Sequence, residues 1–360
     1  MPPDALPPTH PLRSGVVADS PLLAAMRGTR PDTLPVWFMR QAGRSLPEYR
    51  ELRVGHAMLD ACLTPELAAE ITLQPVRRHG VDAGIFFSDI VVPLKLAGLD
   101  VEIVAGRGPV FATPVTSREQ IDALPDPESV DMAPIAAAVA LTVAELGATP
   151  LIGFAGAPFT LAAYLVAGGP DRDQLQARRL MHAEPETWDA LVDWLARLTG
   201  RFLQTQVQAG ASALQLFDSW AGGLSLADYE RFAAPASRRA LDVVRPALGE
   251  GADRAPLVHF ATGSFELLPA MRDAGVDVVG IDHRIPLDVA VSRLGAGVPV
   301  QGNVDPALLT APWEVLEAHV RDVVRRGQAA PAHVVNLGHG VPADTDPTVL
   351  TRIVDLVHSL

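Results

Sequence analysis

The sequence predicts an α/β fold built as a single (β/α)8 barrel of the TIM type, and three features of the chain indicate it. Short apolar runs recur along the chain, each run is followed by a polar or glycine-containing motif, and helix-like segments separate the runs. Repeated strand–helix units of this kind are typical of a barrel of parallel strands. The eight runs span residues 35–39, 83–87, 151–154, 213–217, 257–260, 276–281, 298–301 and 333–337.

The segments between the runs predict helices. Thr64 is a favourable N-cap and Pro65 a favourable first helical residue, which indicates a helix over residues 65–79. Further helices are predicted over residues 189–208, 226–244, 264–274 and 306–326. A doubly wound open sheet is the alternative fold. Its first strand should be followed by a glycine-rich phosphate loop, which the sequence lacks.

The interval between the second and third runs is the longest and predicts an extra hairpin. Its strands are expected over residues 101–104 and 110–115, joined through Gly106 and Gly108. The uncharged stretch 146–170 is long enough to span a bilayer, but prolines and glycines interrupt it. We interpret this stretch as a strand, a loop and a helix in a buried core.

The N-terminal residues predict a leader without structure. Residues 1–20 are rich in proline and lack the apolar stretch of a secretion signal, so we expect them to be disordered. Residues 21–360 are then expected to form one domain, because neither a low-complexity linker nor a sequence repeat divides them.

Composition limits the chemistry that the chain can perform. The formal net charge of −13 argues against nucleic acid and anionic membranes as partners, so an anionic substrate would need a local cluster of arginines. Cys62 is the only cysteine, which excludes an intramolecular disulfide and a zinc site built from several cysteines, and fits a reducing compartment. Lys95 is the only lysine, so a Schiff base would have to use it.

In a barrel, the residues that follow each strand line the active site. Arg40 and Arg44 follow the first run, four residues apart, a spacing that can bring two guanidinium groups into one pocket for a carboxylate or a phosphate. The alternative is a pair of surface arginines on a loop. Asp89 follows the second run, where it either points into the barrel mouth or caps the next helix.

Three further polar residues follow later runs. Tyr164 is either a core residue or part of the site, and His339, between two glycines, either faces a ligand or belongs to a turn. Ser219 has no histidine base beside it and no G-x-S-x-G motif around it, so we expect a hydrogen-bond donor and no nucleophile. A metal site from Asp282, His283 and Asp305 is conceivable, but no metal-binding motif supports it and we expect none.

Two long motifs resemble the signatures of the uroporphyrinogen decarboxylase family. They are P-V-W-F-M-R-Q-A-G-R-S-L-P-E-Y-R at residues 35–50 and G-A-P-F-T-L-A-A-Y-L-V-A-G-G at residues 156–169. The shorter motifs F-S-D-I, L-Q-L-F-D-S-W-A-G, G-N-V-D-P and N-L-G-H-G match the family in type and order, and the resemblance runs from about residue 20 to the C-terminus. One departure is Ser45, where the family commonly has tyrosine, and it concerns the packing of that loop.

The resemblance implies a cytoplasmic (β/α)8 enzyme of haem and porphyrin biosynthesis, usually a homodimer. Such an enzyme converts the tetrapyrrole uroporphyrinogen III to coproporphyrinogen III and releases four CO2 without a metal or an organic cofactor. The family's substrate-binding positions fall on Arg40, Gln41, Ala42, Gly43, Arg44, Asp89, Tyr164, Ser219 and His339. Asp89 corresponds to the aspartate that stabilises the transition state, and Arg40 and Arg44 are the other catalytic candidates.

Two other functions fit parts of the pattern. The first is a methyltransferase of the same superfamily, whose members bind zinc through Cys and His, but Cys62 has no cysteine partner. The second is a tetrapyrrole carrier without catalytic activity, although the presence of Asp89 and both arginines argues against it. Zinc content tests the first alternative, and a turnover assay tests the second.

Overall fold

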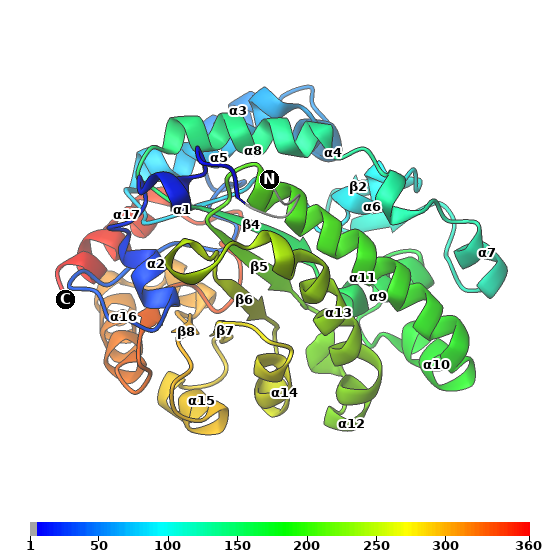
Figure 1. The fold of residues 1–360 in the computed structure, drawn as a ribbon. Coiled ribbons are helices and arrows are strands. Elements are labelled where there is room, and N and C mark those ends of the chain that lie inside the picture. The colour runs from blue at the N-terminus through cyan, green and yellow to red at the C-terminus, as the bar shows by residue number, and fades with distance from the viewer. Residues whose placement is uncertain (1–5) are drawn as a thin grey trace.

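The computed structural model describes residues 6–360 and contains a curled parallel sheet surrounded by helices (Figure 1). Seven strands pair in the order β1-β4-β5-β6-β7-β8-β9, and every pair is parallel. They are β1 (Gly84–Ile85), β4 (Leu151–Gly156), β5 (Ala213–Phe217), β6 (Leu257–Phe260), β7 (Val278–Gly280), β8 (Val300–Gln301) and β9 (His333–Val334). Each strand lies within, or overlaps, one of the predicted apolar runs.

The first apolar run closes the sheet into a ring. Val36 forms a parallel bridge with Val335 just after β9, and the Val36 carbonyl accepts a hydrogen bond of 2.9 Å from the Asp82 N–H just before β1. The segment around Val36 therefore occupies the eighth position of the barrel, between β9 and β1. Its ladder is a single bridge because Pro35 has no N–H to donate. The predicted barrel is confirmed.

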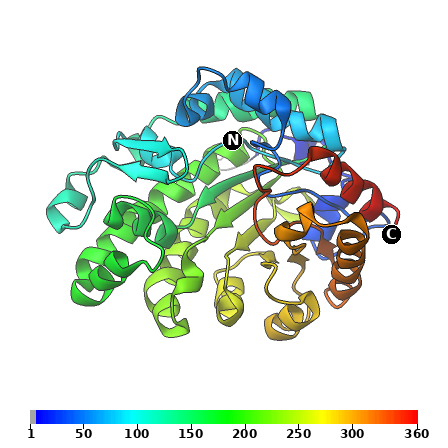
Figure 2. The same cartoon turned by 180° about the vertical axis from the view of Figure 1, so that it is seen from behind.

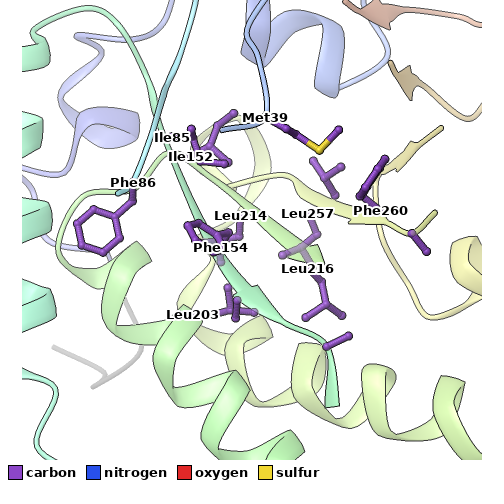
Figure 3. Packing of buried hydrophobic residues seen from close by; sticks show 14 of the residues in the cluster. Met39, Ile85, Phe86, Ile152, Phe154, Leu203, Leu214, Leu216, Leu257 and Phe260 are labelled. Atoms are coloured by element: carbon purple, nitrogen blue, oxygen red, sulfur yellow. The ribbon is translucent and has the colours of Figure 1, made fainter. Parts of the chain in front are cut away.

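Apolar side chains of the sheet pack outward against the surrounding helices, and those of β4 and β5 meet α11 (Pro185–Gln208), which carries Leu203 (Figure 3). The barrel interior contains a short hydrogen-bonded chain of polar side chains. The Trp37 indole donates to Gln301 Oε1 at 3.1 Å, and Gln301 Nε2 donates to Gln215 Oε1 at 3.0 Å. These three residues are buried, and pairing among them removes most of the cost of burying their polar groups.

Helices surround the sheet (Figures 1 and 2). Those of eight or more residues are α5 (Pro65–His79), α8 (Ala133–Leu146), α9 (Pro158–Ala167), α10 (Leu175–Ala183), α11, α13 (Ala234–Val244), α15 (Leu287–Leu294), α16 (Trp313–Gly327) and α17 (Pro347–His358). The shorter ones are α1 (Pro11–Ser14), α2 (Pro21–Met26), α3 (Pro47–Leu52), α4 (Met58–Leu63), α6 (Val92–Leu96), α7 (Arg118–Asp122), α12 (Leu226–Asp228) and α14 (Leu268–Asp273). Single turns η1 to η7 lie at Pro127–Ser129, Ala221–Gly223, Tyr229–Ala233, Arg245–Ala247, Gly251–Asp253, Phe265–Leu267 and Pro306–Thr310.

Helix α5 has the predicted bounds, but its start differs in detail. The Thr64 hydroxyl donates to the Asp60 carbonyl at 2.8 Å, so Thr64 provides no side-chain cap to α5. Three other predicted helices are interrupted. Residues 226–244 contain the π-helical turn η3, and residues 264–274 and 306–326 each begin as a tight 3-10 turn.

The predicted hairpin between β1 and β4 is present. Its strands β2 (Val101–Val104) and β3 (Gly108–Phe111) are antiparallel, so the second strand begins earlier than predicted and includes Gly108. Gly106 has a φ of 75° in the turn, a conformation that glycine adopts without strain. The hairpin lies against α9, because the Phe111 N–H donates to the Gly168 carbonyl at 3.0 Å.

Residues 6–20 are folded, which corrects the prediction of a disordered leader up to residue 20. Leu6, Leu12 and Val17 are buried, and the His10 Nε2–H donates to the Val207 carbonyl at the end of α11 at 2.8 Å. A few well-spaced apolar side chains fix the segment despite its prolines, because each gains free energy by burial. Residues 1–5, the rest of the predicted leader, lie outside the described residues.

The uncharged stretch 146–170 forms β4 and α9, as predicted. Taken singly, no helix within residues 6–360 is both long and apolar enough to cross a membrane, although one bent pair, Arg118–Ser129 with Ala133–Leu146, meets the test of length and composition.

Candidate active site

Five of the predicted site residues follow the carboxyl ends of barrel strands, where a parallel barrel collects them into one mouth. Arg40 follows the closing segment, Asp89 follows β1, Tyr164 lies in α9 after β4, Ser219 follows β5 and His339 follows β9. The charge of Arg40 acts on Asp89, Tyr164 and His339, which places these four side chains in a common electrostatic environment.

Arg40 is exposed and has a left-handed backbone with φ of 62°. This conformation costs about 1–2 kcal/mol in a residue with a Cβ, so neighbouring contacts must hold it. The Met39 N–H donates to Asn336 Oδ1 at 2.9 Å, and the Gln41 N–H donates to the Phe38 carbonyl at 3.0 Å. These two bonds fix the chain on both sides of Arg40 and direct its side chain.

Asp89 is half-buried at the start of the turn that leads into α6. Its Oδ1 accepts the Val91 N–H at 3.1 Å, and its carbonyl accepts the Val92 N–H at 3.0 Å. Burial raises the pKa of the Asp89 carboxyl, while the Val91 hydrogen bond and the charge of Arg40 lower it less strongly. Asp89 therefore combines the two expected roles, since one oxygen organises the turn and the carboxylate remains part of the mouth.

Tyr164 and Ser219 are linked through Trp220. The Tyr164 and Trp220 rings meet edge to face with 5.6 Å between their centroids. The backbone N–H of Trp220 donates to Thr160 Oγ1 at 3.2 Å. Burial raises the pKa of the Tyr164 hydroxyl, the hydrogen bond with Trp220 lowers it, and nearby Asp89 raises it. The Ser219 carbonyl accepts the Thr262 hydroxyl at 2.9 Å, which ties the loop after β5 to the loop after β6.

His339 is exposed at the rim of the mouth. Its Nδ1 accepts the Gly340 N–H at 2.7 Å, so the neutral ring carries its proton on Nε2. Loss of solvation lowers the pKa of His339, and the positive charge of Arg40 lowers it further. His339 is therefore a neutral hydrogen-bond donor at neutral pH, with Nε2 as the donating atom.

Residues 18–360 match the family model described as "Uroporphyrinogen decarboxylase (URO-D)". The chain belongs to the uroporphyrinogen decarboxylase family. A uroporphyrinogen decarboxylase from Arthrobacter sp. (strain FB24) is 66% identical over 346 residues, which cover 96% of this chain and 99% of the relative. Another from Leifsonia xyli subsp. xyli (strain CTCB07) is 62% identical, and the match covers 98% of each chain.

The structural neighbours agree on the fold. A methyltransferase from Methanosarcina mazei superposes with a TM-score of 0.75 at 18% identity, covering 96% of this chain and 98% of the neighbour. A B12-independent methionine synthase from Shewanella sp. W3-18-1 gives a TM-score of 0.52 at 11% identity, covering 82% of this chain and 88% of the neighbour. At these identities the likeness concerns the barrel alone.

Some positions that the uroporphyrinogen decarboxylase signature assigns to substrate binding have side chains that support the loop. The Gln41 side chain is fully buried, with Oε1 accepting the Phe38 N–H at 3.0 Å and Nε2 donating to the Ala83 carbonyl at 2.9 Å. Its side chain therefore supports the loop. Ala42 and Gly43 are half-buried, and a Cβ on Gly43 would lie 2.9 Å from the Arg40 carbonyl oxygen.

Arg44 lies on the same loop as Arg40. It is exposed, its carbonyl accepts Arg50 Nη1 at 2.8 Å, and its charge acts on Tyr49. The family departure Ser45 is buried beside it at 3% exposure. Arg40 and Arg44 lie outside the helices and Arg40 has a left-handed backbone, so their four-residue spacing is not that of a helical pair.

Two of the three residues considered as metal ligands, Asp282 and Asp305, are engaged elsewhere. Asp282 accepts the Arg284 guanidinium at 2.8 Å, and Asp305 Oδ1 accepts the Ala307 N–H at 2.9 Å. Within residues 6–360, no group of three or more His, Cys, Asp and Glu side chains is placed to hold a metal ion. Cys62 is buried, and burial raises the pKa of its thiol well above the ordinary value, so the thiolate that zinc requires is disfavoured.

Sequence reasoning missed the residues that position the others. Thr160 donates to Asp218 Oδ1 at 2.7 Å and accepts from the Trp220 N–H, which fixes the tryptophan against Tyr164. Thr160 and Trp220 lie within the quoted motifs, but no residue-type pattern marks a threonine or a tryptophan as a support.

Proposed function

We propose that this protein decarboxylates uroporphyrinogen III. Each of the four acetate side chains loses CO2 and gains a proton to become a methyl group, which gives coproporphyrinogen III for porphyrin and haem biosynthesis. The observation that supports this most strongly is that half-buried Asp89 lies within the electrostatic influence of Arg40 in the barrel mouth of a member of this family. Asp89 suits the N–H groups at the centre of the substrate, and Arg40 suits the carboxylates at its periphery.

The chemistry needs an electron sink for the pair left by CO2. Protonation of the pyrrole carbon next to the one that bears the acetate makes the ring cationic. The C–C bond to the carboxylate then breaks, and its electron pair forms an exocyclic double bond that neutralises the ring cation. The substrate is thus its own sink, so residues of a pyridoxal or thiamine site are not required. A proton added to the exocyclic carbon and loss of the ring proton complete the methyl group.

Asp89 suits the stabilisation of this cation. An ionised carboxylate beneath a flat tetrapyrrole can accept the inward N–H groups, and its charge opposes the positive charge that develops on the ring nitrogens. Burial raises its pKa, which indicates that few water dipoles solvate the charge, and an incoming cation will be stabilised more strongly for that reason. Arg40 lowers the same pKa and helps to keep the free enzyme's carboxylate ionised.

Arg40, Tyr164, Ser219 and His339 surround this centre as substrate-binding groups. Arg40 offers a planar fork to a side-chain carboxylate, and the neutral His339 offers its Nε2–H. A guanidinium is a poor acid, and burial weakens the Tyr164 hydroxyl as an acid by raising its pKa. We therefore propose that a water molecule beside Arg40 delivers the proton.

We also propose the organisation in which this chemistry occurs. Residues 21–360 act as one domain, with residues 6–20 packed against it, because one apolar cluster runs through the described residues. The active form is a cytoplasmic homodimer that needs no metal or organic cofactor and binds neither nucleic acid nor membranes. The net charge of −13 supports the last two points.

The test is anaerobic incubation of the purified protein with uroporphyrinogen III, with and without a chelator. We expect stepwise loss of CO2 through products with seven, six, five and four carboxylates, at a rate that the chelator leaves unchanged. Tight binding of the porphyrinogen without CO2 release would identify a carrier. Activity that a chelator abolishes and zinc restores would overturn the proposal that no cofactor is needed. Bound zinc with methyl transfer would favour the methyltransferase alternative.

A further inference from the structure

Arg284 is a cation of the barrel mouth to which the signatures assign no role. It follows β7 and its side chain is 56% exposed, yet it is anchored to Asp282, whose side chain is fully buried. The Asp282 Oδ2 accepts Arg284 Nη1 at 2.8 Å and also the Gly263 N–H, while Oδ1 accepts the Arg284 N–H at 3.0 Å. The buried carboxylate thus holds one edge of an exposed guanidinium in place.

The position of Arg284 around the ring complements that of the other cations. The closing segment is the first position of the barrel, β1 the second, β7 the sixth and β9 the eighth. Arg40 and His339 therefore lie on adjacent positions, and Asp89 follows the second. Arg284 follows the sixth position, opposite Asp89 in a ring of eight, and its charge acts on His339 within the same mouth.

A substrate with eight carboxylates distributed around a macrocycle needs partners on more than one side. Arg40 covers the side near the first position, and no other arginine placed by the signatures covers the far side. Arg284 retains donors that Asp282 does not occupy, because a guanidinium has five N–H groups and its Nη1 carries the contact. Because Asp282 already holds the guanidinium of Arg284 in place, the side chain loses little entropy on binding, which favours recognition of a carboxylate.

We propose that Arg284 binds a side-chain carboxylate of the tetrapyrrole on the wall of the mouth opposite Asp89, and so contributes to substrate affinity and orientation. This inference rests on the proposed function. The carboxylate that Arg284 contacts belongs to a propionate group. Because the propionates remain after every decarboxylation, each intermediate can make the same contact. Asp282 is then a positioning residue that acts through Arg284.

The experiment compares Arg284→Gln and Arg284→Lys with wild type in steady-state decarboxylation. Arg284→Gln should raise KM about tenfold to a hundredfold while kcat changes little, as expected for loss of one charge-assisted hydrogen bond. Arg284→Lys keeps the charge beside Asp282 but loses the planar fork, so its KM should be intermediate. The rise should be similar for uroporphyrinogen and for the intermediate with five carboxylates.

Arg254→Gln is the matched control. Arg254 Nη1 contacts Asp277 Oδ1 at 2.8 Å, the same type of pair, but Arg254 precedes β6 and Asp277 precedes β7, at the opposite end of the barrel. Arg254→Gln should leave KM unchanged. Thermal unfolding of each variant separates binding from folding, and Arg284→Lys carries the test if Arg284→Gln does not fold.

The outcomes are distinguishable. Active wild type with an unchanged KM in folded Arg284→Gln and Arg284→Lys overturns the inference and leaves the proposed function intact. A fall in kcat at constant KM would also overturn it, because it indicates a structural role for the Arg284–Asp282 pair. Wild-type protein without decarboxylase activity overturns the proposed function itself.

Discussion

The side chain of Arg40 lies over Gly340, so closely that a Cβ on the glycine would come within 2.4 Å of the arginine Cδ. The glycine after His339 therefore provides the space in which the arginine side chain is seated. The two residues are 300 positions apart in the sequence and meet because the closing segment pairs beside β9.

This contact predicts that Gly340→Ala disables the enzyme without unfolding it. The methyl group would meet the flexible arginine side chain, which can move away, so stability should change by less than about 1 kcal/mol. Displacement of the guanidinium by even 1 Å should lower kcat/KM about a hundredfold. Gly169→Ala is the control, because its Cβ makes only ordinary contacts, the nearest 3.4 Å from the Pro109 carbonyl oxygen. Equal kinetics for the two variants would show that the seating of Arg40 is unimportant.

The two arginines of the signature should differ in importance. Arg40→Ala should lower kcat/KM by the equivalent of about 2–5 kcal/mol, because it removes the charge that acts on Asp89 and His339. Arg44→Ala should cost less, since the charge of Arg44 acts on Tyr49, whereas that of Arg40 acts on Asp89, Tyr164 and His339. Lysine at position 40 should rescue only partly. Measuring kcat/KM for all three variants decides this, and a larger loss in Arg44→Ala would reverse the assignment.

Asp89→Asn separates binding from cation stabilisation. Asparagine keeps an oxygen for the Val91 N–H and for the pyrrole N–H groups but removes the charge. We expect substrate binding to persist and the single-turnover rate to fall at least about a hundredfold, the scale for loss of one preorganised electrostatic group. Asp89→Glu, with its charge displaced by about one methylene, should be intermediate. An unchanged single-turnover rate in Asp89→Asn would leave Asp89 as a binding group or a turn residue.

The raised pKa of Asp89 predicts a trade between stability and activity. Burial makes the native state hold this proton more tightly than the unfolded chain does, so stability falls as pH rises through the interval between the two pKa values. At neutral pH Asp89→Asn should therefore have a higher Tm than wild type, and the difference should shrink in acid. Thermal unfolding against pH measures it. A lower Tm for the variant at neutral pH would contradict this sign.

Cys62 should be dispensable for catalysis. It is fully buried and its thiol has a raised pKa, which makes it a packing residue. Cys62→Ala should keep kcat and lose about 1–2 kcal/mol of stability through the cavity, whereas Cys62→Ser also buries a hydroxyl. Kinetics and chemical unfolding of both variants test this. Loss of turnover in a stable Cys62→Ala protein would revive a thiol or metal role.

Much of the fold was predictable because its signals are local. A strand buried on both faces needs a continuous apolar run, and such runs located all the barrel positions, including the one that closes the ring by a single bridge. Helix interruptions were less predictable. The π-helical turn Tyr229–Ala233 interrupts a region with continuous helical spacing, and spacing alone does not register a change in backbone winding.

Sequence reasoning named the residues of the candidate site but did not give their arrangement. The residue types after each run pointed to Arg40, Asp89, Tyr164, Ser219 and His339, and the barrel topology places these residues in one mouth. The support that Thr160 gives to Trp220 could not be predicted, because it depends on which loops meet. The burial of residues 6–20 was missed for the same reason, since composition does not reveal a docking surface formed by the end of α11.

By itself the sequence determined the strand positions, the family signatures and the scarcity of cysteine and lysine, all of which are properties of residues and their near neighbours. The tertiary structure alone decided that Arg40 adopts a left-handed backbone, lies over Gly340 and shares a mouth with Arg284. The physical reason is that charges and steric contacts act over a few ångströms in space. Only closure of the barrel brings residues hundreds of positions apart within that range.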